Sequence, residues 1–233
     1  CIRDRHWILT NPLTRRLYGR FLHFLDGQNI ERRIQDIALD QSARYVMEHM
    51  NGVPSFGNDF ELLEHALKHV DQSKDGLYCE FGVWRGTTIN HIAKRVASTV
   101  WGFDSFEGLP ERWRDGFERG RFKLQKLPKV RSNVKLVKGW FNETIPPFLE
   151  ENQGPLRFLH VDCDLYSSTT TIFECFRNRI VSGTVIVFDE FFNYPGWEEG
   201  ERKALEEFVA ATGFAYEWLG YCRYHEQAAL IIR

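Results

Sequence analysis

A short apolar run that ends in an acid and two glycines constrains the fold of this chain more than any other feature. The stretch from Leu77 to Thr88 reads LYCEFGVWRGTT, and apolar residues then recur at helical spacing at Ile89, Ile92, Ala93 and Val96. This pattern predicts a strand, a tight turn and a helix. A ligand could approach the backbone closely at Gly82 and Gly86, where a Cβ would obstruct it, and the free amides at the start of the helix would face that ligand.

A second apolar run, Val100–Asp104, follows the first and also ends in a carboxylate. In open α/β sheets an acid at this position binds the hydroxyls of a ribose. The pattern acid-x-Gly-x-x-x-Gly differs from the dinucleotide pattern Gly-x-Gly-x-x-Gly, so S-adenosylmethionine fits better than a pyrophosphate-bearing cofactor; a purely structural turn is the alternative. The candidate contacts to this methyl donor are Glu80, Gly82, Gly86, Thr88, Asp104, Ser105 and Phe106, joined from later motifs by Gly139, Trp140 and Asp162.

The composition is that of one large α/β domain with a substantial core. The chain has 233 residues, of which 43% are hydrophobic and 27% charged, and its net charge of -2 argues against nucleic acid and anionic membranes as partners. It has no apolar run of about 20 residues that could span a bilayer. The five cysteines show no Cys-x-x-Cys spacing, which indicates buried thiols in a reducing compartment, so we expect a cytoplasmic protein. Because the chain opens on Cys1, we expect it to be trimmed or part of a longer polypeptide.

We divide the chain into an N-terminal helical arm or lid, residues 1–58, and an α/β domain that would bind the methyl donor, residues 59–233. Residues 1–28 are predicted to form a short helix or an arm against a partner subunit. A helix is predicted over residues 30–50, followed by a loop over residues 53–58 and a second helix from Asp59.

Two segments after Asp104 allow alternative interpretations. The stretch from Arg112 to Lys135 is rich in Lys and Arg, and it is either a solvated, mobile insertion or a flap that meets an anionic or sugar-rich substrate. A strand is predicted over residues 134–138, and Gly139-Trp140 at its end places an aromatic ring either on a purine or in the core.

Two further strands end in acids. The run Leu156–Val161 leads into Asp162 and Asp164, and a run over residues 184–188 leads into Asp189-Glu190. A helix between these strands makes them parallel, so both acid clusters lie at the same edge of the sheet, beside the first turn.

The last two predicted strands, residues 214–219 and 228–232, are joined by a short segment and must be antiparallel. The fold class is therefore α/β, a doubly wound, mostly parallel sheet with a late antiparallel strand, which is the outline of a class I methyltransferase.

Four carboxylates at one edge would repel one another unless a cation separates them. Oxygen ligands without a cysteine or histidine set favour Mg²⁺ or Ca²⁺, and helix-capping acids are the alternative. A metal there could bind a substrate hydroxyl, and Asp164 is our candidate for the base that takes its proton. His160 is interpreted as a satisfied interior residue, His225 as a weaker alternative base, and Ser167 as a helix N-cap.

These motifs together resemble the macrocin O-methyltransferase family of S-adenosylmethionine-dependent, metal-dependent enzymes, from about Gly52 to the C-terminus. The motifs are EFGVWRG at 80–86, GFDSFEGLP at 102–110, GWFNETIP at 139–146, HVDCDLYSS at 160–168 and the acid pair at 189–190. The resemblance implies Mg²⁺ held by Asp162, Asp189 and Glu190, with Asp164 as base. It also implies a small-molecule acceptor, a sugar or aromatic hydroxyl of a natural product, and a possible homo-oligomer.

One residue departs from the family pattern, which usually has two aspartates after the fifth strand where this chain has Asp189-Glu190. The longer glutamate moves its oxygens outward by about 1.5 Å, which is large for Mg²⁺, so the ion could bind through a water, weakly or not at all. We therefore expect a Mg²⁺-assisted O-methyltransferase, with a catalytically inactive nucleoside-binding scaffold as the alternative. A nicotinamide oxidoreductase is disfavoured because its glycine pattern is absent.

Overall fold

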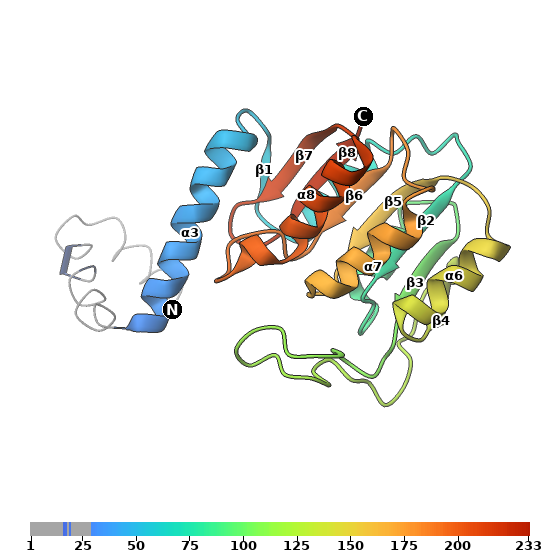
Figure 1. Ribbon diagram of the computed structural model, residues 1–233, viewed down its shortest axis with the longest axis horizontal. Coiled ribbons are helices and arrows are strands. Elements are labelled where there is room, and N and C mark those ends of the chain that lie inside the picture. The colour runs from blue at the N-terminus through green and yellow to red at the C-terminus, as the bar shows by residue number, and fades with distance from the viewer. Residues whose placement is uncertain (1–15, 18, 20–28) are drawn as a thin grey trace, which may run out of the picture.

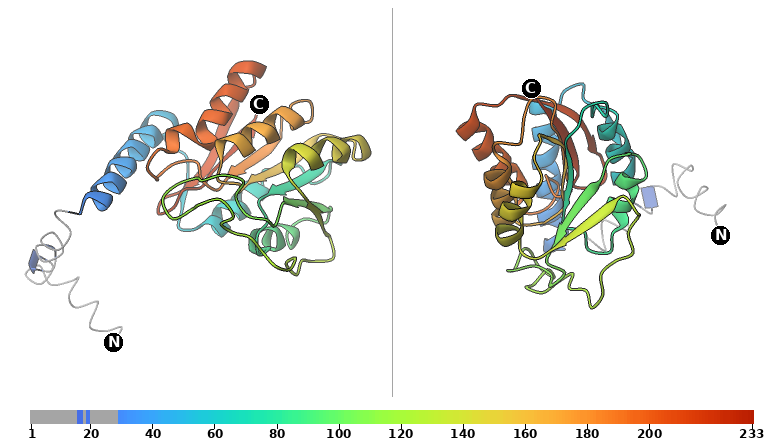
Figure 2. Two further views of the ribbon diagram at one scale, coloured as in Figure 1. Left: turned by 60° about the horizontal axis from the view of Figure 1, so that its bottom comes forward. Right: turned by 90° about the vertical axis from the view of Figure 1, so that its right-hand side faces the viewer.

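The structure, a computed structural model, describes residues 16–17, 19 and 29–233. The predicted helix or arm over residues 1–28 therefore falls almost entirely outside the described residues. An eight-stranded sheet forms the centre of the described chain, and helices cover both of its faces (Figures 1 and 2).

The order of strands along the sheet is β1-β7-β8-β6-β5-β2-β3-β4. Strand β8 is antiparallel to both of its neighbours, β6 and β7, and the other neighbouring pairs are parallel. The bounds are β1 Ser55–Phe56, β2 Leu77–Phe81, β3 Val100–Asp104, β4 Val134–Lys138, β5 Leu156–Val161, β6 Val185–Phe188, β7 Tyr216–Cys222 and β8 Ala228–Ile232. The predicted doubly wound sheet with a late antiparallel strand is confirmed.

The helices divide between the two faces of the sheet. Side chains of α3, α6, α7 and α8 belong to one core cluster, and those of α4 and α5 belong to the other. The bounds are α3 Ile30–His49, α4 Asp59–Leu67, α5 Thr87–Ala93, α6 Phe141–Glu151, α7 Tyr166–Phe176 and α8 Glu201–Thr212, with a 3-10 turn, η1, at Trp197–Glu199. Because helices cover both faces, central strands such as β2 are buried at every residue rather than at alternate ones.

This topology brings the predicted site residues to one edge. The chain reverses its direction of progress through the sheet at β2, which lies between β3 and β5. In sheets of this kind, ligands bind in the crevice beyond the carboxyl ends of the strands at such a reversal. The segments that follow β2, β3, β5 and β6 carry Gly82, Ser105, Asp162 and Asp189, so these residues meet at that crevice.

The N-terminal boundary region differs from its prediction. The segment over residues 53–58 was expected to be a loop, but Ser55 and Phe56 pair with Tyr221 and Cys222 of β7 and extend the sheet by one strand. The C-terminal half of α3 also packs into the main core, where the Tyr45 ring lies 5.5 Å from that of Trp197. The division at residue 58 remains a prediction, and β1 already belongs to the sheet of the second part.

The segment over residues 105–133 contains no helix or strand, yet it is held by hydrogen bonds. The backbone N–H of Leu109 donates to the carbonyl of Arg121, and the Asn90 side chain on α5 bonds the backbone of Lys129 and Arg131. These bonds fold the insertion against the body of the protein, which favours the flap interpretation over a freely solvated loop.

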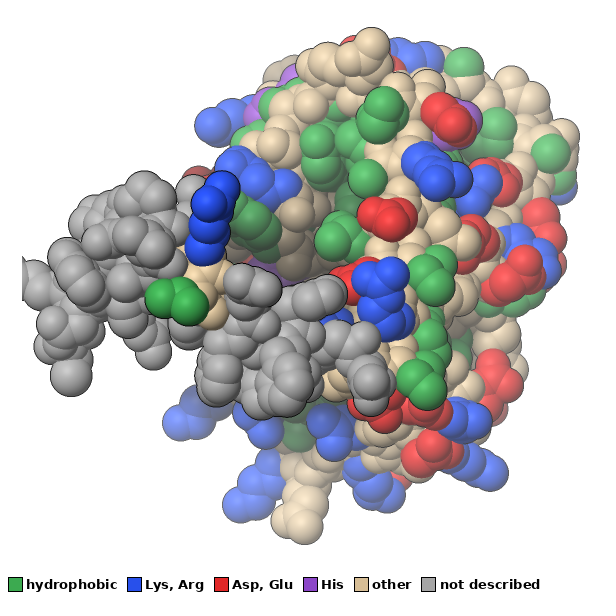
Figure 3. All heavy atoms as spheres, turned by 90° about the vertical axis from the view of Figure 1, so that its left-hand side faces the viewer, with side chains coloured by type: hydrophobic (Ala, Val, Ile, Leu, Met, Phe, Trp, Pro, Cys, Tyr) green, Lys and Arg blue, Asp and Glu red, His purple; other side chains and the backbone are tan. Residues whose placement is uncertain are grey.

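The surface agrees with the small net charge. On much of the face shown in Figure 3, acidic and basic side chains are interspersed. Among the described helices, none combines the length and the apolar character needed to cross a membrane.

Candidate functional site

The turn after β2 requires glycine. Gly82 has a φ of +94°, and a Cβ there would lie 1.6 Å from the carbonyl oxygen of Asp162. Gly86 has a φ of +77° and caps the start of α5. Both glycines thus adopt conformations that L side chains rarely accept, and the turn after β2 lies directly against the start of the Asp162 segment.

The carboxylate of Asp104 holds this turn from the neighbouring strand. One of its oxygens accepts the backbone N–H groups of Val83 and Trp84, at 2.9 and 2.7 Å. Its other oxygen accepts the N–H of Phe106 at 2.6 Å. Each carboxylate oxygen can accept more than one bond, so Asp104 can still receive a ribose hydroxyl.

A cavity of about 850 Å³ opens between this turn and the acids after β5 and β6. Its volume is near the upper end of the range for ligand sites, which is room for a methyl donor together with an acceptor. The predicted donor contacts that line it are Gly82, Thr88, Asp104, Ser105, Trp140 and Asp162. The four others, Glu80, Gly86, Phe106 and Gly139, do not line it.

Each of these four has a visible reason for its place. Glu80 is fully buried and turns towards His160 and Thr88. Gly86 lies beneath Pro128, and the ring of Phe106 is buried in the core cluster that contains α4 and α5. Gly139 turns the chain at the end of β4 with a φ of +145°. These residues shape the turns around the cavity, and donor contact by them remains a prediction.

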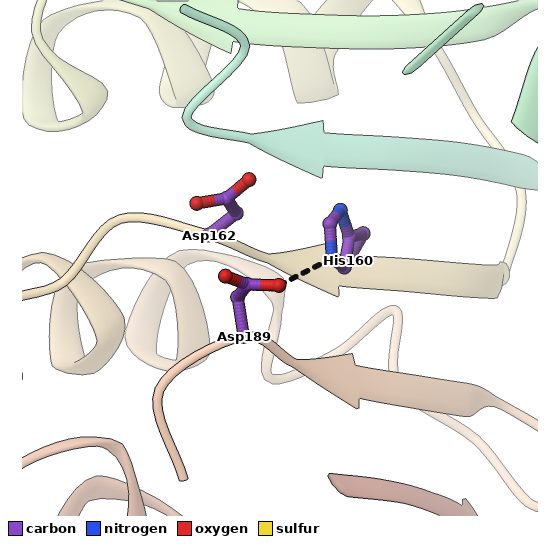
Figure 4. A group of neighbouring side chains, drawn as sticks. All are labelled: His160, Asp162 and Asp189. Atoms are coloured by element: carbon purple, nitrogen blue, oxygen red, sulfur yellow. Dashed lines mark ion pairs between the residues drawn. The ribbon is translucent and has the colours of Figure 1, made fainter. Parts of the chain in front are cut away.

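The four predicted acids lie around the same cavity. Asp162, Asp164, Asp189 and Glu190 all line it. Potential ligand atoms of Asp162, Asp189 and His160 lie within 4.8 Å of one another (Figure 4). Among the described residues, Glu190 does not belong to this group. The four acids therefore lie at one edge of the sheet, as expected. The three side chains whose ligand atoms lie closest together, however, include His160 in place of Glu190.

Burial and the charges of neighbouring acids raise the pKa of Asp162, Asp164 and Glu190. Burial raises the pKa of Asp162 well above its usual value, and the neighbouring charges of Asp189 and Glu80 add to the shift. Burial and then Asp189 likewise raise the pKa of Glu190. For Asp164, burial and Asp189 raise the pKa to about 7, against the opposing effect of Arg114.

This donor set fits a hard divalent cation. Asp164 and Glu190 are buried, Asp162 and Asp189 are partly buried, and the Oε2 atom of Glu190 has no hydrogen-bond partner in the described chain. A cation between Asp162 and Asp189 would offset the repulsion between their carboxylates, which contributes to the raised pKa of Asp162.

His160 is only half satisfied, contrary to its interpretation as an ordinary interior residue. It is fully buried, and its Nδ1 atom lies 3.0 Å from Oε2 of Glu80. Its Nε2 atom has no hydrogen-bond partner and lies 3.9 Å from Oδ1 of Asp189. Burial alone would lower the pKa of His160, but the hydrogen bond and charge of Glu80 oppose it, and the net shift is upward.

Sequence reasoning missed several residues that support the acids. The Gln227 side chain donates to Oδ1 of Asp189 at 3.1 Å. The carboxylate of Glu201, also buried, accepts the N–H of Glu190 at 3.1 Å. Arg114 of the insertion bonds both oxygens of Glu226, at 3.0 and 3.1 Å. The only signal for Glu201 was an acid in the first turn of a helix, and Gln227 carried none.

One minor prediction is wrong, and another gains no support. Helix α7 begins at Tyr166 after Leu165, without a side-chain cap. Ser167 is therefore not an N-cap, and its hydroxyl donates instead to Glu111 of the insertion at 2.7 Å. His225 is exposed and does not line the cavity, so nothing in its position supports its role as an alternative base.

The strand order, with β8 antiparallel between β6 and β7, is that of a class I methyltransferase fold. Residues 57–217 match the family model described as Macrocin-O-methyltransferase (TylF). Because this match spans more than half of the chain, the protein belongs to that family, as its sequence motifs predicted.

Two curated relatives come from streptomycetes. The 8-demethyl-8-(2,3-dimethoxy-alpha-L-rhamnosyl)-tetracenomycin-C 4'-O-methyltransferase of Streptomyces olivaceus is 31% identical, over 58% of this chain and 66% of the relative. The demethyldecarbamoylnovobiocin O-methyltransferase of Streptomyces niveus is 24% identical, over 64% of this chain and 63% of the relative. The chain thus spans slightly less than two thirds of the length of these relatives.

Solved structures show the same fold. The crystal structure of the calicheamicin methyltransferase CalS11 has a TM-score of 0.59 at 21% identity, and the match covers 95% of this chain and 93% of CalS11. The O-methyltransferase NovP has a TM-score of 0.55 at 22% identity, and the match covers 74% of this chain and 76% of NovP.

Proposed function

We propose that this protein transfers the methyl group of S-adenosylmethionine to a hydroxyl of a small, polar or glycosylated natural product, with help from Mg²⁺. The observation that carries the proposal is that one cavity joins the glycine turn after β2 to the acids after β5 and β6. Such an arrangement places a donor and an acceptor hydroxyl together, and alignment of this kind supplies much of the rate of a bimolecular transfer.

Asp164 is the proposed general base. It lines the cavity, it is buried, and its pKa of about 7 suits a group that must accept a proton near neutral pH. In the transfer, an O–CH₃ bond forms as the S–CH₃ bond of the sulfonium breaks. The hydroxyl proton passes to the Asp164 carboxylate, and S-adenosylhomocysteine leaves.

Asp162 and Asp189 are the proposed holders of the cation, with Glu190 beside them. When bound, the cation would lower the pKa of the acceptor hydroxyl and stabilise its developing negative charge.

The acceptor class follows from the lining of the cavity and from the relatives. The aromatic residues Trp84, Phe122 and Trp140 line the cavity, and Arg119 lines it as well. Aromatic faces with a polar edge suit sugars and aromatic units. The names of both curated relatives describe natural-product O-methyltransferases, one of them acting on a rhamnosyl compound.

The test is a transfer assay with methyl-labelled S-adenosylmethionine, Mg²⁺ and a panel of glycosylated and phenolic acceptors. We expect one class of acceptor to gain a labelled methyl group, and the Asp164→Asn variant to lose this transfer. Calorimetry with S-adenosylhomocysteine is run beside it. Binding of this product without transfer to any acceptor would favour the scaffold alternative that the Glu190 departure leaves open.

A further inference from the structure

We propose that His160 is itself a ligand of the cation, through Nε2, together with Asp162 and Asp189, and that Glu80 orients its ring. The site would then prefer Mn²⁺ or Co²⁺ to Mg²⁺. This inference rests on the cation site of the proposed function, but it does not depend on methyl transfer.

The first observation is an unpartnered nitrogen. His160 is fully buried, and its Nε2 atom has no hydrogen-bond partner among the described residues. A buried polar atom without a partner is costly, so a buried nitrogen of this kind calls for a bound group. In Figure 4 the ring lies beside Asp189 on the same side of the sheet, and the Asp189 oxygen at 3.9 Å is too far away to serve as a hydrogen-bond acceptor.

The second observation is the carboxylate on the other side of the ring. Glu80 accepts from the Thr88 hydroxyl through Oε1 at 3.1 Å, and its Oε2 lies 3.0 Å from Nδ1 of His160. Residues 80 and 160 are also register partners on the adjacent strands β2 and β5. A carboxylate at Nδ1 draws the ring proton to that atom, which leaves the lone pair of Nε2 facing the acids. A carboxylate, a histidine and a metal in this order form a common unit of metal sites.

The third observation is the spacing of the trio. The potential ligand atoms of His160, Asp162 and Asp189 lie within 4.8 Å of one another. Adjacent ligands about 2.1 Å from one octahedral ion lie about 3 Å apart, so the widest pair of these atoms would have to approach by between about 1 and 2 Å when the ion binds. Gln227 already fixes the carboxylate of Asp189 by its 3.1 Å hydrogen bond.

A nitrogen ligand changes which metal the site selects. Mg²⁺ strongly prefers oxygen, whereas imidazole raises the affinity for transition metals such as Mn²⁺ and Co²⁺. It also accounts for the glutamate at position 190, because the closest trio is complete without it. The longer side chain at that position is then no obstacle to metal binding.

The experiment is pulsed electron paramagnetic resonance of the Mn²⁺-loaded protein, grown with ¹⁴N-histidine and again with ¹⁵N-histidine. We expect electron spin echo modulation from one histidine nitrogen, replaced by the ¹⁵N pattern in the labelled protein. The modulation should disappear in His160→Gln and persist in His69→Gln, a matched change at an exposed histidine. Calorimetry should show Mn²⁺ binding at least about tenfold weaker in His160→Gln, and about 10- to 100-fold weaker in Glu80→Gln.

Saturable Mn²⁺ binding without nitrogen modulation in the wild-type protein would overturn the proposal, and this result needs no variant to fold. Modulation that persists in His160→Gln would also overturn it, as would the absence of saturable Mn²⁺ binding. Two further measurements separate these failures from failure of the methyltransferase proposal itself. Methyl transfer that persists with a chelator, or binding of S-adenosylhomocysteine in calorimetry, would leave that proposal standing although His160 is not a ligand.

Discussion

The substitution Gly82→Ala tests the contact between the turn after β2 and the start of the segment that carries Asp162. Alanine at this position has to adopt a φ of +94°, and its Cβ would lie 1.6 Å from the carbonyl oxygen of Asp162. The left-handed conformation alone costs about 1–2 kcal/mol. Since real Cβ atoms do not approach a backbone oxygen so closely, either the turn or the start of the Asp162 segment must also move.

Gly116→Ala is the matched control. Gly116 has a φ of +81°, and a Cβ there would meet nothing within 4 Å, so this variant carries the conformational cost without the clash. We expect urea unfolding to show a loss of about 1–2 kcal/mol for Gly116→Ala and about 4 kcal/mol or more for Gly82→Ala.

Calorimetry with S-adenosylhomocysteine gives the functional half of this test. Binding should be unchanged in Gly116→Ala and at least about 100-fold weaker in Gly82→Ala, because the displaced turn faces the cavity. Equal stability and equal binding in the two variants would refute the close packing of Gly82 against Asp162.

Three further predictions concern the acids and the insertion. Asp164→Asn should lower kcat by about 10²- to 10⁴-fold, as expected for loss of a general base, with binding of S-adenosylhomocysteine within about twofold of wild type in calorimetry. A double-mutant cycle on Arg114 and Glu226, measured by urea unfolding, should give a coupling of about 1 kcal/mol, and either single variant should raise the KM for the acceptor more than that for the donor. A coupling free energy near zero would contradict the view that this ion pair holds the insertion against the body of the protein. The pKa of Glu201 is raised in the folded protein. As pH rises above about 4.5, the unfolded state releases the Glu201 proton while the folded state still holds it. The free energy of unfolding therefore falls as pH rises through this range. Glu201→Gln should therefore raise the Tm of the metal-free protein at pH 8 more than at pH 5, and an equal change at both would contradict this sign.

Much of the fold could be predicted because the central strands are buried on both faces. Such strands read as continuous apolar runs, and the runs Val100–Asp104 and Leu156–Val161 have the predicted bounds, while β2 begins at Leu77 as predicted. The two-residue strand at Ser55–Phe56 could not be found this way, because it is too short to show a pattern and is defined by its pairing with β7. For the same reason the division at residue 58 cuts between β1 and the rest of its sheet.

The site could be predicted where a residue's place in the fold follows from its position directly after a strand. Acids at strand ends come together at one edge in any parallel sheet, which placed Asp162 and Asp189 correctly. The partner of His160 was hidden because it depends on the register between β2 and β5, which places Glu80 opposite the histidine. Gln227 bonds Asp189 and Arg114 bonds Glu226 across long sequence separations, and nothing local to Gln227 or Arg114 in the sequence indicates these contacts.

A crystal structure of the protein with S-adenosylhomocysteine tests the central claim most directly. We expect the ribose near Asp104, the homocysteine portion against the Gly82 turn, and the sulfur atom facing the space between Asp164 and the Asp162–Asp189 pair. An empty Gly82 turn, or a sulfur atom that points away from these acids, would contradict it.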